Sequence, residues 1–286
     1  MALTAEALAK INRELRVGAV RADGFHEIKS RFVSIDLADT VLAEMSLARI
    51  AFVSDDASLP QDERNLVVQA AQLLASILGT AAGARLRLTK RIPAGAGLGG
   101  GSSDAAATIA VLKRLWEAEL SEADVTELAA RLGSDVPFFL TGGQAEVTGR
   151  GERVKALPDE APVELMVFVP AFEVSTGEVY GAHRRRHTGK GTLPERLEVE
   201  TSGRFFGPNE LEPAILEVQP LMRILLETAR ANAREAAITG SGSAIVLVAP
   251  GDEAVARLAA VLPGARFFRT RTVSRDEYAQ RSAPRT

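Results

Sequence analysis

The chain has 286 residues, of which 46% are hydrophobic and 25% charged, a composition typical of a globular protein long enough for two domains. Its net charge of −3 argues against a general nucleic-acid binder, and the absence of cysteine excludes disulfides and thiolate chemistry. The three histidines are too scattered for a histidine-based metal centre, so no metal ligand is assigned. The first residues carry no secretory signal and the longest apolar runs are too short to span a membrane, which predicts a cytoplasmic protein without a membrane partner.

The first half of the chain predicts a mixture of strands and helices. Residues 9–20 alternate between apolar and polar positions, which indicates a half-buried strand with Lys10 and Asn12 on its polar face. Arg13 falls on the apolar side, where an arginine has to pair, reach solvent or lie at a strand end. The elements that follow are strand-like sequence to Leu42 and over 47–53, a helix over 64–78 ended by Gly79, a strand over 84–92, a helix over 103–118 capped by Ser102 or Ser103, and a helix from Ser121 closed by Gly133.

The second half repeats this mixture, which predicts an α+β protein of two domains, residues 1–150 and 151–286. The expected elements are a strand over 163–170, a helix over 219–233, two strands around a glycine turn within 236–250, a helix over 251–262 and a strand over 265–273. The polar segment 183–192 is expected to be a solvated loop. The tail, residues 280–286, is expected to be disordered.

The segment PAGAGLGGGSSDAAAT, residues 93–108, places five glycines within seven positions directly before a predicted helix. Gly95, Gly97 and Gly100 satisfy G-x-G-x-x-G, but the strand before them is charged at every second or third position, unlike the apolar strand before a dinucleotide-binding turn. No lysine follows the glycines directly, which excludes a Walker A loop. A merely flexible connection would cost considerable chain entropy. The segment therefore predicts a phosphate-binding loop at a helix N-terminus.

Three stretches, taken in order, resemble the three motifs of the GHMP kinase superfamily: AKIN (9–12), PAGAGLGGGSSDAA (93–106) and ITGSGSA (238–244). DGFHEI (23–28) and LGSDVPFFL (132–140) narrow the resemblance to members whose acceptor alcohol carries a cytidine diphosphate, in the non-mevalonate route to isoprenoid precursors. The resemblance covers nearly the whole chain. It implies an ATP-dependent kinase with a ribosomal-S5-like N-terminal domain and a ferredoxin-like C-terminal domain.

The resemblance assigns the catalytic roles to Lys10 and Asp135. Asp135 would orient the acceptor hydroxyl and take its proton, while a cation beside it favours the ionised carboxylate and neutralises charge on the phosphoryl group in transfer. From the residues alone, Asp135 could equally cap a helix and Lys10 could be a solvated lysine. Arg13 and Glu14 depart from the apolar residues usual after the first motif, which puts the local geometry near Lys10 in question.

The resemblance also implies the binding residues. Asn12 would hold the acceptor alcohol, Phe25 would stack on cytosine without the hydroxyl of the usual tyrosine, and His26 would hydrogen-bond the base edge. From the residues alone, Phe25 could be a core residue, His26 an ordinary histidine, and Asn65 a helix cap. The residues assigned to ATP are Asn65, Pro93, Ala94, Gly95, Ala96, Gly97, Leu98, Gly99, Gly100, Gly101, Ser102 and Ser103. The residues assigned to the substrate are Asn12, Phe25, His26, Tyr180 and Thr176, with Ser175 near the diphosphate. The third glycine motif contributes Gly240, Ser241 and Gly242, although this motif taken alone would indicate a hairpin turn.

The implied ligands are ATP, the cytidine diphosphate substrate and Mg²⁺, which the reaction needs because the phosphates are charged. Two alternatives are a kinase of the same superfamily for a smaller alcohol, such as homoserine or mevalonate, and a non-catalytic nucleotide binder. The pair Phe25–His26 argues against the first, because a small acceptor needs no platform for a base. The presence of both Lys10 and Asp135 argues against the second.

Overall fold

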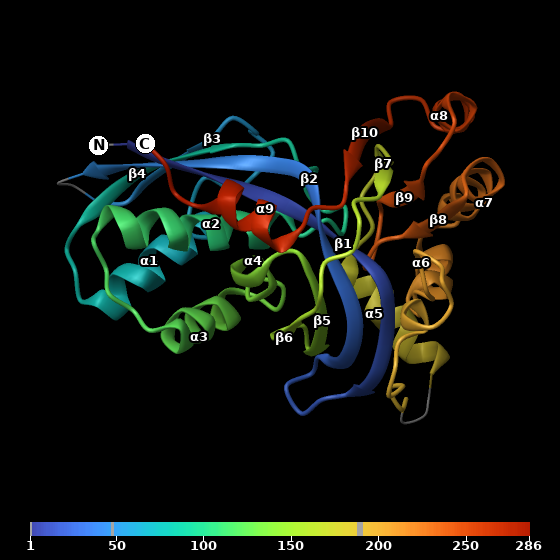
Figure 1. Cartoon of the computed structure of the whole chain (residues 1–286), viewed down its shortest axis with the longest axis horizontal. Helices are drawn as coiled ribbons and strands as arrows, with labels where there is room; N and C mark the ends of the chain where they lie inside the picture. The colour runs from blue at the N-terminus through green and yellow to red at the C-terminus, as the bar shows by residue number, and fades with distance from the viewer. Residues whose placement is uncertain (1, 47–48, 188–190) are drawn as a thin grey trace.

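The computed structural model describes residues 2–46, 49–187 and 191–286, which form two β-sheets with helices packed against them (Figure 1). The predicted α+β class is confirmed. The first sheet has the order β3-β4-β2-β5-β6 with β1 paired to β2, and the second has the order β10-β7-β9-β8. The strands are β1 (Ala2–Val20), β2 (His26–Ser46), β3 (Ala51–Ser54), β4 (Gly83–Thr89), β5 (Gln144–Gly149), β6 (Arg153–Ala156), β7 (Glu164–Val169), β8 (Glu235–Ile238), β9 (Ile245–Val248) and β10 (Arg266–Arg271).

The helices form two groups, one beside each sheet (Figure 1). The first sheet carries α1 (Leu66–Leu78), α2 (Gly100–Leu115), α3 (Glu122–Leu132), α4 (Phe138–Thr141) and, from the end of the chain, α9 (Arg275–Ser282). The second sheet carries α5 (Thr176–Arg186), α6 (Glu212–Val218), α7 (Leu221–Asn232) and α8 (Asp252–Val261), and a 3₁₀ helix lies at Glu198–Glu200. Both β6 and α9 follow residue 150, yet they belong to the first sheet and its core.

The long hairpin of β1 and β2 crosses from one sheet to the other, and β1 contributes to three apolar clusters in turn. Its first part, including Leu3 and Leu8, packs with α1 and α2. Its middle part, including Ile11, packs between the two sheets, and its last part, including Leu15, packs with the helices of the second sheet. The strand is therefore buried on both faces along most of its length, and the prediction of a half-buried strand over 9–20 is wrong.

Local sequence explains where the helices begin and end. The Asn65 side chain accepts a hydrogen bond from the N–H of Val67 at the start of α1, and Gly79 ends that helix in the left-handed conformation, as predicted. Ser121 and Asp124 form a capping box on α3. The N-cap of α2 is Gly99, not Ser102 or Ser103, which lie inside the helix. A glycine stands at position 99 because φ is +73° there and the Phe139 ring comes within 2.7 Å of the place of a Cβ.

Arg13 is buried and paired, which was one of the three possibilities open to it. Its Nε donates to the carbonyl of Phe205 at 2.9 Å, its Nη1 lies 2.8 Å from Glu160, and its guanidinium stacks 4.5 Å above the Phe205 ring. Glu14 is 1% exposed and accepts hydrogen bonds from Arg16 and from the N–H of Val199. The two unusual residues after the first motif therefore tie β1 to the second half of the chain.

Two segments differ from their predicted structure. The expected loop at 183–192 is helical through Arg186, with His183 buried, and residues 188–190 lie outside the described part of the chain. The tail expected to be disordered, residues 280–286, forms the end of α9 and then a bridge, in which Arg285 and Thr4 exchange backbone hydrogen bonds of 2.8 and 2.9 Å. The predicted strand over 47–53 is β3, which begins at Ala51, with residues 47–48 outside the described part.

Candidate active site

A cavity of about 490 Å³ opens where the two halves of the molecule meet. It brings together eleven of the residues predicted for the site, from every one of the sequence motifs: Lys10, Asn12, Phe25, His26, Gly97, Gly99, Asp135, Thr176, Tyr180, Gly240 and Ser241. The remaining predicted residues do not line it: Asn65, Pro93, Ala94, Gly95, Ala96, Leu98, Gly100, Gly101, Ser102, Ser103 and Gly242. Segments more than 200 residues apart in sequence therefore share one chemical site.

Lys10 lies on β1 at the floor of the cavity and is 4% exposed, so it is not a solvated lysine. Its Nζ donates to Asn12 Oδ1 at 2.9 Å, lies 3.2 Å from Asp135 Oδ2 and sits 4.4 Å above the Phe32 ring. A buried ammonium with a carboxylate and an amide oxygen as partners interacts with nearby charge far more strongly than a solvated one. The arrangement suits the neutralisation of negative charge.

Asp135 lies in the turn between α3 and α4, and its side chain points at Lys10. Its backbone carbonyl accepts a hydrogen bond from the N–H of Phe138, and the N-cap of α4 is Pro137, so Asp135 does not cap that helix. The side chain keeps 29% of its surface exposed at the cavity wall. A carboxylate held beside a buried cation and open to a cavity can meet a bound hydroxyl group.

Asn12 is fixed in orientation from two sides. Its Nδ2 donates to Ser30 Oγ at 2.9 Å, and its backbone N–H donates to Thr239 Oγ1 at 2.8 Å. Thr239 precedes the third glycine motif, so the first and third motifs are in direct contact. The amide oxygen of Asn12 faces Lys10, as the hydrogen bond between them shows.

The glycine loop packs against both other motifs. The backbone N–H of Lys10 donates to the carbonyl of Leu98 at 3.0 Å, and the N–H of Ala244 donates to the carbonyl of Ala96 at 3.1 Å. Gly97 has φ of +78°, and a Cβ there would lie 2.6 Å from the carbonyl oxygen of Thr239. Glycine is therefore required at this position both by conformation and by space.

We expect Gly97→Ala to destabilise the protein by about 2–4 kcal/mol, because it adds a clash to the cost of a left-handed residue. It should also weaken MgATP binding at least about tenfold, because the loop must move away from the third motif. Gly79→Ala is the matched control, since Gly79 has φ of +60° but open space around its Cβ position. Thermal melts and calorimetric titration with a non-hydrolysable ATP analogue measure both effects. Equal behaviour of the two variants would show that the clash is unimportant.

Several predicted ATP-binding residues have structural partners. Ser103 is 1% exposed, and its hydroxyl donates to the carbonyl of Leu8 at 2.7 Å. Asn65 accepts from the N–H of Val67 and donates to the carbonyl of Pro60, so its amide acts as the helix cap that the residues alone allowed. Ser102 is the serine of the pair whose hydroxyl lies toward the turn that carries Asp135, near Gly133.

A buried charge cluster under the loop was missed from the sequence. The Lys90 ammonium lies 2.5 Å from Asp39 and 2.9 Å from Asp104, and all three side chains are at most 6% exposed. Burial raises the pKa of the Asp104 carboxyl well above its usual range, although Lys90 opposes that rise. The Asp39 carboxylate also accepts the backbone N–H groups of Arg91 and Ile92. The cluster therefore joins β2, the residues that follow β4 and the N-terminal part of α2.

Three aromatic side chains, Phe25, His26 and Tyr180, line the cavity. Phe25 is 48% exposed at the tip of the β1–β2 hairpin, which excludes a core role, and the Arg150 guanidinium lies 5.2 Å from its ring. His26 is 7% exposed, and its ring lies 5.2 Å from that of Tyr180 at an interplanar angle of 32°. Burial, aided by Arg184 and His183, lowers the pKa of His26. The histidine is therefore held in its neutral form, which can both donate and accept hydrogen bonds.

Two arginines that line the cavity, Arg150 and Arg184, were not found from the sequence. Arg184 falls in the run that was expected to be a loop. The N-cap Ser175, whose hydroxyl accepts from the N–H of Glu178, was a sequence signal for α5. A helix that begins there places Thr176, Tyr180 and Arg184 at four-residue spacing on one face, and all three line the cavity.

The chain is similar to known proteins over most of its length. The model of the GHMP kinases N terminal domain matches residues 65–143. The 4-diphosphocytidyl-2-C-methyl-D-erythritol kinase of Pelotomaculum thermopropionicum is 39% identical over 258 residues, which cover 86% of this chain and 88% of that protein. The same-named protein of Bacillus cereus is 37% identical over 252 residues, 86% of this chain and 87% of that protein.

Solved structures are similar to this chain as well. A crystal structure of 4-(cytidine 5'-diphospho)-2C-methyl-D-erythritol kinase superposes with a TM-score of 0.78 at 37% identity and covers 94% of this chain and 98% of its own. A homoserine kinase from Cytophaga hutchinsonii, at 21% identity and a TM-score of 0.68 over 99% of this chain and 96% of its own, shares the fold. No helix among the described residues is long and apolar enough to cross a membrane. The resemblance in the motifs is confirmed, and the chain belongs to the 4-diphosphocytidyl-2-C-methyl-D-erythritol kinase family of the GHMP kinases.

Proposed function

We propose that this protein transfers the γ-phosphoryl group of ATP to the 2-hydroxyl of 4-diphosphocytidyl-2-C-methyl-D-erythritol. One observation carries the proposal: the 3.2 Å pair of Lys10 and Asp135 lies in the same cavity as the aromatic group Phe25, His26 and Tyr180. The pair supplies what phosphoryl transfer to an alcohol needs, and the aromatic group supplies a place for a nucleobase. The names of the similar proteins support the same reaction.

The catalytic step needs an aimed hydroxyl and an acceptor for its proton. Asp135 takes the proton of the acceptor hydroxyl, and Lys10 neutralises the charge that develops on the transferring group. Asn12, held by Ser30 and Thr239, orients the alcohol next to them. Because Lys10 is buried and fixed by three contacts, it needs no reorganisation as the charge moves.

The nucleotide phosphates lie on the glycine loop, where Gly97 and Gly99 line the cavity and the N-terminus of α2, which begins after Gly99, favours negative charge. A metal that enters with ATP takes most of its oxygen ligands from the phosphates and from water, so the hydroxyl and carboxylate oxygens that line the cavity fit such a metal. When bound, Mg²⁺ neutralises phosphate charge and favours the reactive alignment. Of the two serines, Ser102 would supply the hydroxyl that contacts the metal, because the Ser103 hydroxyl already donates a hydrogen bond to the carbonyl of Leu8.

The acceptor extends from the catalytic pair toward the hairpin tip. Phe25 and Tyr180 stack on the cytosine, and neutral His26 forms a hydrogen bond with the edge of the base. Thr176, whose hydroxyl lies 2.8 Å from that of Ser241, faces the diphosphate together with Arg150 and Arg184. A smaller alcohol would leave this half of the cavity empty, which argues against an acceptor such as homoserine or mevalonate.

The test is an ADP-release assay with MgATP and each of three acceptors: 4-diphosphocytidyl-2-C-methyl-D-erythritol, homoserine and mevalonate. Release with the cytidine substrate alone, inhibited competitively by CDP, supports the proposal. Release with another alcohol would keep the kinase and remove the base-binding role of Phe25 and His26. No release from folded protein that still binds MgATP would favour a non-catalytic nucleotide binder.

The pH dependence of substrate binding provides a separate prediction. Because burial, Arg184 and His183 lower the pKa of His26 from its ordinary value of 6.5, the ring stays neutral to a lower pH than a free histidine. The KM for the cytidine substrate should therefore stay level to a lower pH than the titration of an ordinary histidine would allow, and rise only at more acidic pH. In Arg184→Gln the loss of a nearby positive charge raises the pKa of His26, so the rise should begin at a higher pH. An unchanged onset, with a level KM for ATP as the control, would rule His26 out as the titrating group.

A further inference from the structure

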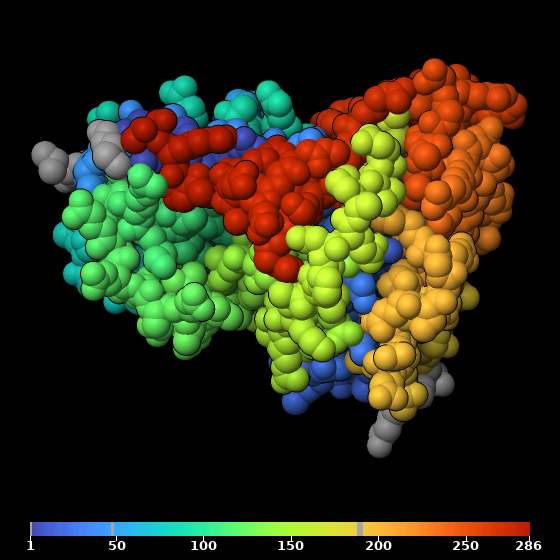
Figure 2. Space-filling view, in the orientation of Figure 1, coloured from blue at the N-terminus to red at the C-terminus, as the bar shows by residue number. Residues whose placement is uncertain are grey.

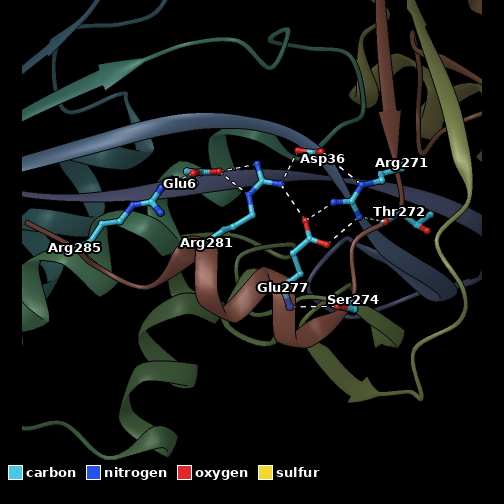
Figure 3. Close-up of polar contacts among 8 residues, drawn as sticks. All are labelled: Glu6, Asp36, Arg271, Thr272, Ser274, Glu277, Arg281 and Arg285. Atoms are coloured by element: carbon cyan, nitrogen blue, oxygen red, sulfur yellow. Dashed lines mark hydrogen bonds and ion pairs between the residues drawn. The ribbon is translucent and has the colours of Figure 1, made fainter.

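The helix α9 is anchored by Arg281 to the N-terminal strands β1 and β2 and by Glu277 to the end of β10. Arg281 bridges Glu6 of β1 and Asp36 of β2 at 2.7 and 2.6 Å, and Arg271 pairs with Glu277 at 2.6 Å (Figure 3). Beyond α9, Arg285 pairs with Thr4 through the backbone. In Figure 2 this C-terminal segment, coloured red, lies over the blue N-terminal strands. It lies between the green surface of the α2–α4 region and the yellow-green surface of the residues that follow α4 in the chain.

Only one side chain of this polar helix is buried, and that is Tyr278. Its ring, 3% exposed, lies against Gly142, where a Cβ would come within 2.0 Å of it. Its hydroxyl donates to the carbonyl of Phe139 at 2.6 Å. Burial raises the pKa of Tyr278, so the hydroxyl keeps the proton that it donates.

The carbonyl that Tyr278 binds belongs to α4, a helix of four residues. The last carbonyls of a helix have no partner within it, and so short a helix has little stability of its own. Gly142 satisfies the carbonyl of Phe138, while Tyr278 satisfies that of Phe139. Without the hydroxyl, the Phe139 carbonyl would lose a buried partner.

Both phenylalanines of α4 contact the catalytic machinery. The Phe139 ring lies 2.7 Å from the Cβ position of Gly99 in the phosphate loop. The Phe138 ring packs edge-on to Phe32 at 5.3 Å, and Phe32 supports the Lys10 ammonium. The N–H of Phe138 also donates to the carbonyl of Asp135. A shift of α4 would therefore change the spacing of Lys10, Asp135 and the loop together.

We propose that Tyr278 is a positioning residue of the active site: through its hydrogen bond to Phe139, α9 holds α4 so that Asp135 and the phosphate loop keep their spacing from Lys10. This inference rests on the proposed kinase function, because Asp135 and Lys10 are the groups that it positions. Tyr278 does not line the cavity and lies in the hydrophobic core beside the first sheet.

The test compares two variants. Tyr278→Phe keeps the ring and removes only the hydroxyl. Leu258→Ala truncates a core side chain of α8, in the hydrophobic cluster beside the second sheet, away from α4 and Tyr278. At a temperature where both variants are folded, Tyr278→Phe should lower kcat about tenfold with both KM values within about twofold, because small misplacements of reacting groups act on turnover. Leu258→Ala should lower the melting temperature but leave kcat unchanged. An unchanged kcat in Tyr278→Phe, or an equal fall in both variants, would overturn the proposal.

A second measurement does not depend on activity. Hydrogen exchange of the amides over 99–103 and 135–140 should be faster in Tyr278→Phe and unchanged in Leu258→Ala, because only the first variant loosens α4. If the wild-type protein proves inactive with every acceptor, the kinase proposal fails, and the exchange comparison still decides whether Tyr278 holds α4. Equal exchange in both variants would show that the hydrogen bond to Phe139 has no such effect.

Discussion

Asp135→Asn is expected to lower kcat by about 10²–10⁴-fold, because the amide cannot take the proton of the acceptor hydroxyl. The substitution keeps the size and shape of the side chain, and the Asp135 backbone still receives the N–H of Phe138. MgATP binding should therefore stay within about twofold of the wild type. Single-turnover phosphoryl transfer and calorimetric titration with an ATP analogue measure the two quantities separately.

The matched control is Asp252→Asn, which alters an aspartate side chain that is 94% exposed on α8, far from the cavity. It should leave both turnover and nucleotide binding unchanged. Unaltered turnover in Asp135→Asn would remove this residue as the base and leave the carboxylate as a partner of Lys10 only. A loss of turnover with intact binding would rule out the non-catalytic nucleotide binder.

Lys10→Met is expected to lower kcat by about 10²–10³-fold, because it removes the cation next to the reacting centre. Methionine is apolar and flexible enough to occupy the space above the Phe32 ring, so the fold should be retained. The loss leaves Asp135 without its ion-pair partner and Asn12 Oδ1 without its 2.9 Å donor. Lys155→Met, at an exposed position on β6, is the control.

A double variant tests whether the two residues act as one unit. Groups that act together show costs that do not add, so Lys10→Met with Asp135→Asn should be about as slow as the slower single variant. Fully additive losses would mean that Lys10 and Asp135 act on separate steps. Rate measurements on all four proteins under saturating MgATP provide the comparison.

Much of the architecture could be predicted from local sequence. The helices with clear caps and apolar periodicity, such as α1 after Asn65 and α3 after Ser121, lie where they were expected. The burial of β1 on both faces could not be predicted, since it depends on a second sheet whose strands all follow residue 160. α9 was missed because seven of its eight residues are not buried and its stability comes from partners such as Glu6 and Asp36.

In the candidate site, too, local sequence motifs could be assigned, whereas residues placed by tertiary packing could not. Residues inside recognisable motifs, such as Lys10, Asp135 and Gly97, could be assigned because each motif lies within a few consecutive positions. Arg150 and Arg184 were not assigned, because Arg150 is a single arginine between two glycines and Arg184 is one of three consecutive arginines in a segment that was expected to be a loop. Contacts between motifs, such as that of Gly97 with Thr239, depend on the way the halves pack.

The packing of β1 in three apolar clusters determines how the protein unfolds. A chain cut near residue 150 would leave Leu15 and Val17 of the first fragment without the helices that cover them, and the second fragment without one wall of its core. Neither fragment could reach a native state alone, so genetic dissection into halves would give insoluble products. Heating the intact protein should produce one calorimetric transition, with equal van't Hoff and calorimetric enthalpies, and a ligand in the cavity should shift that whole transition.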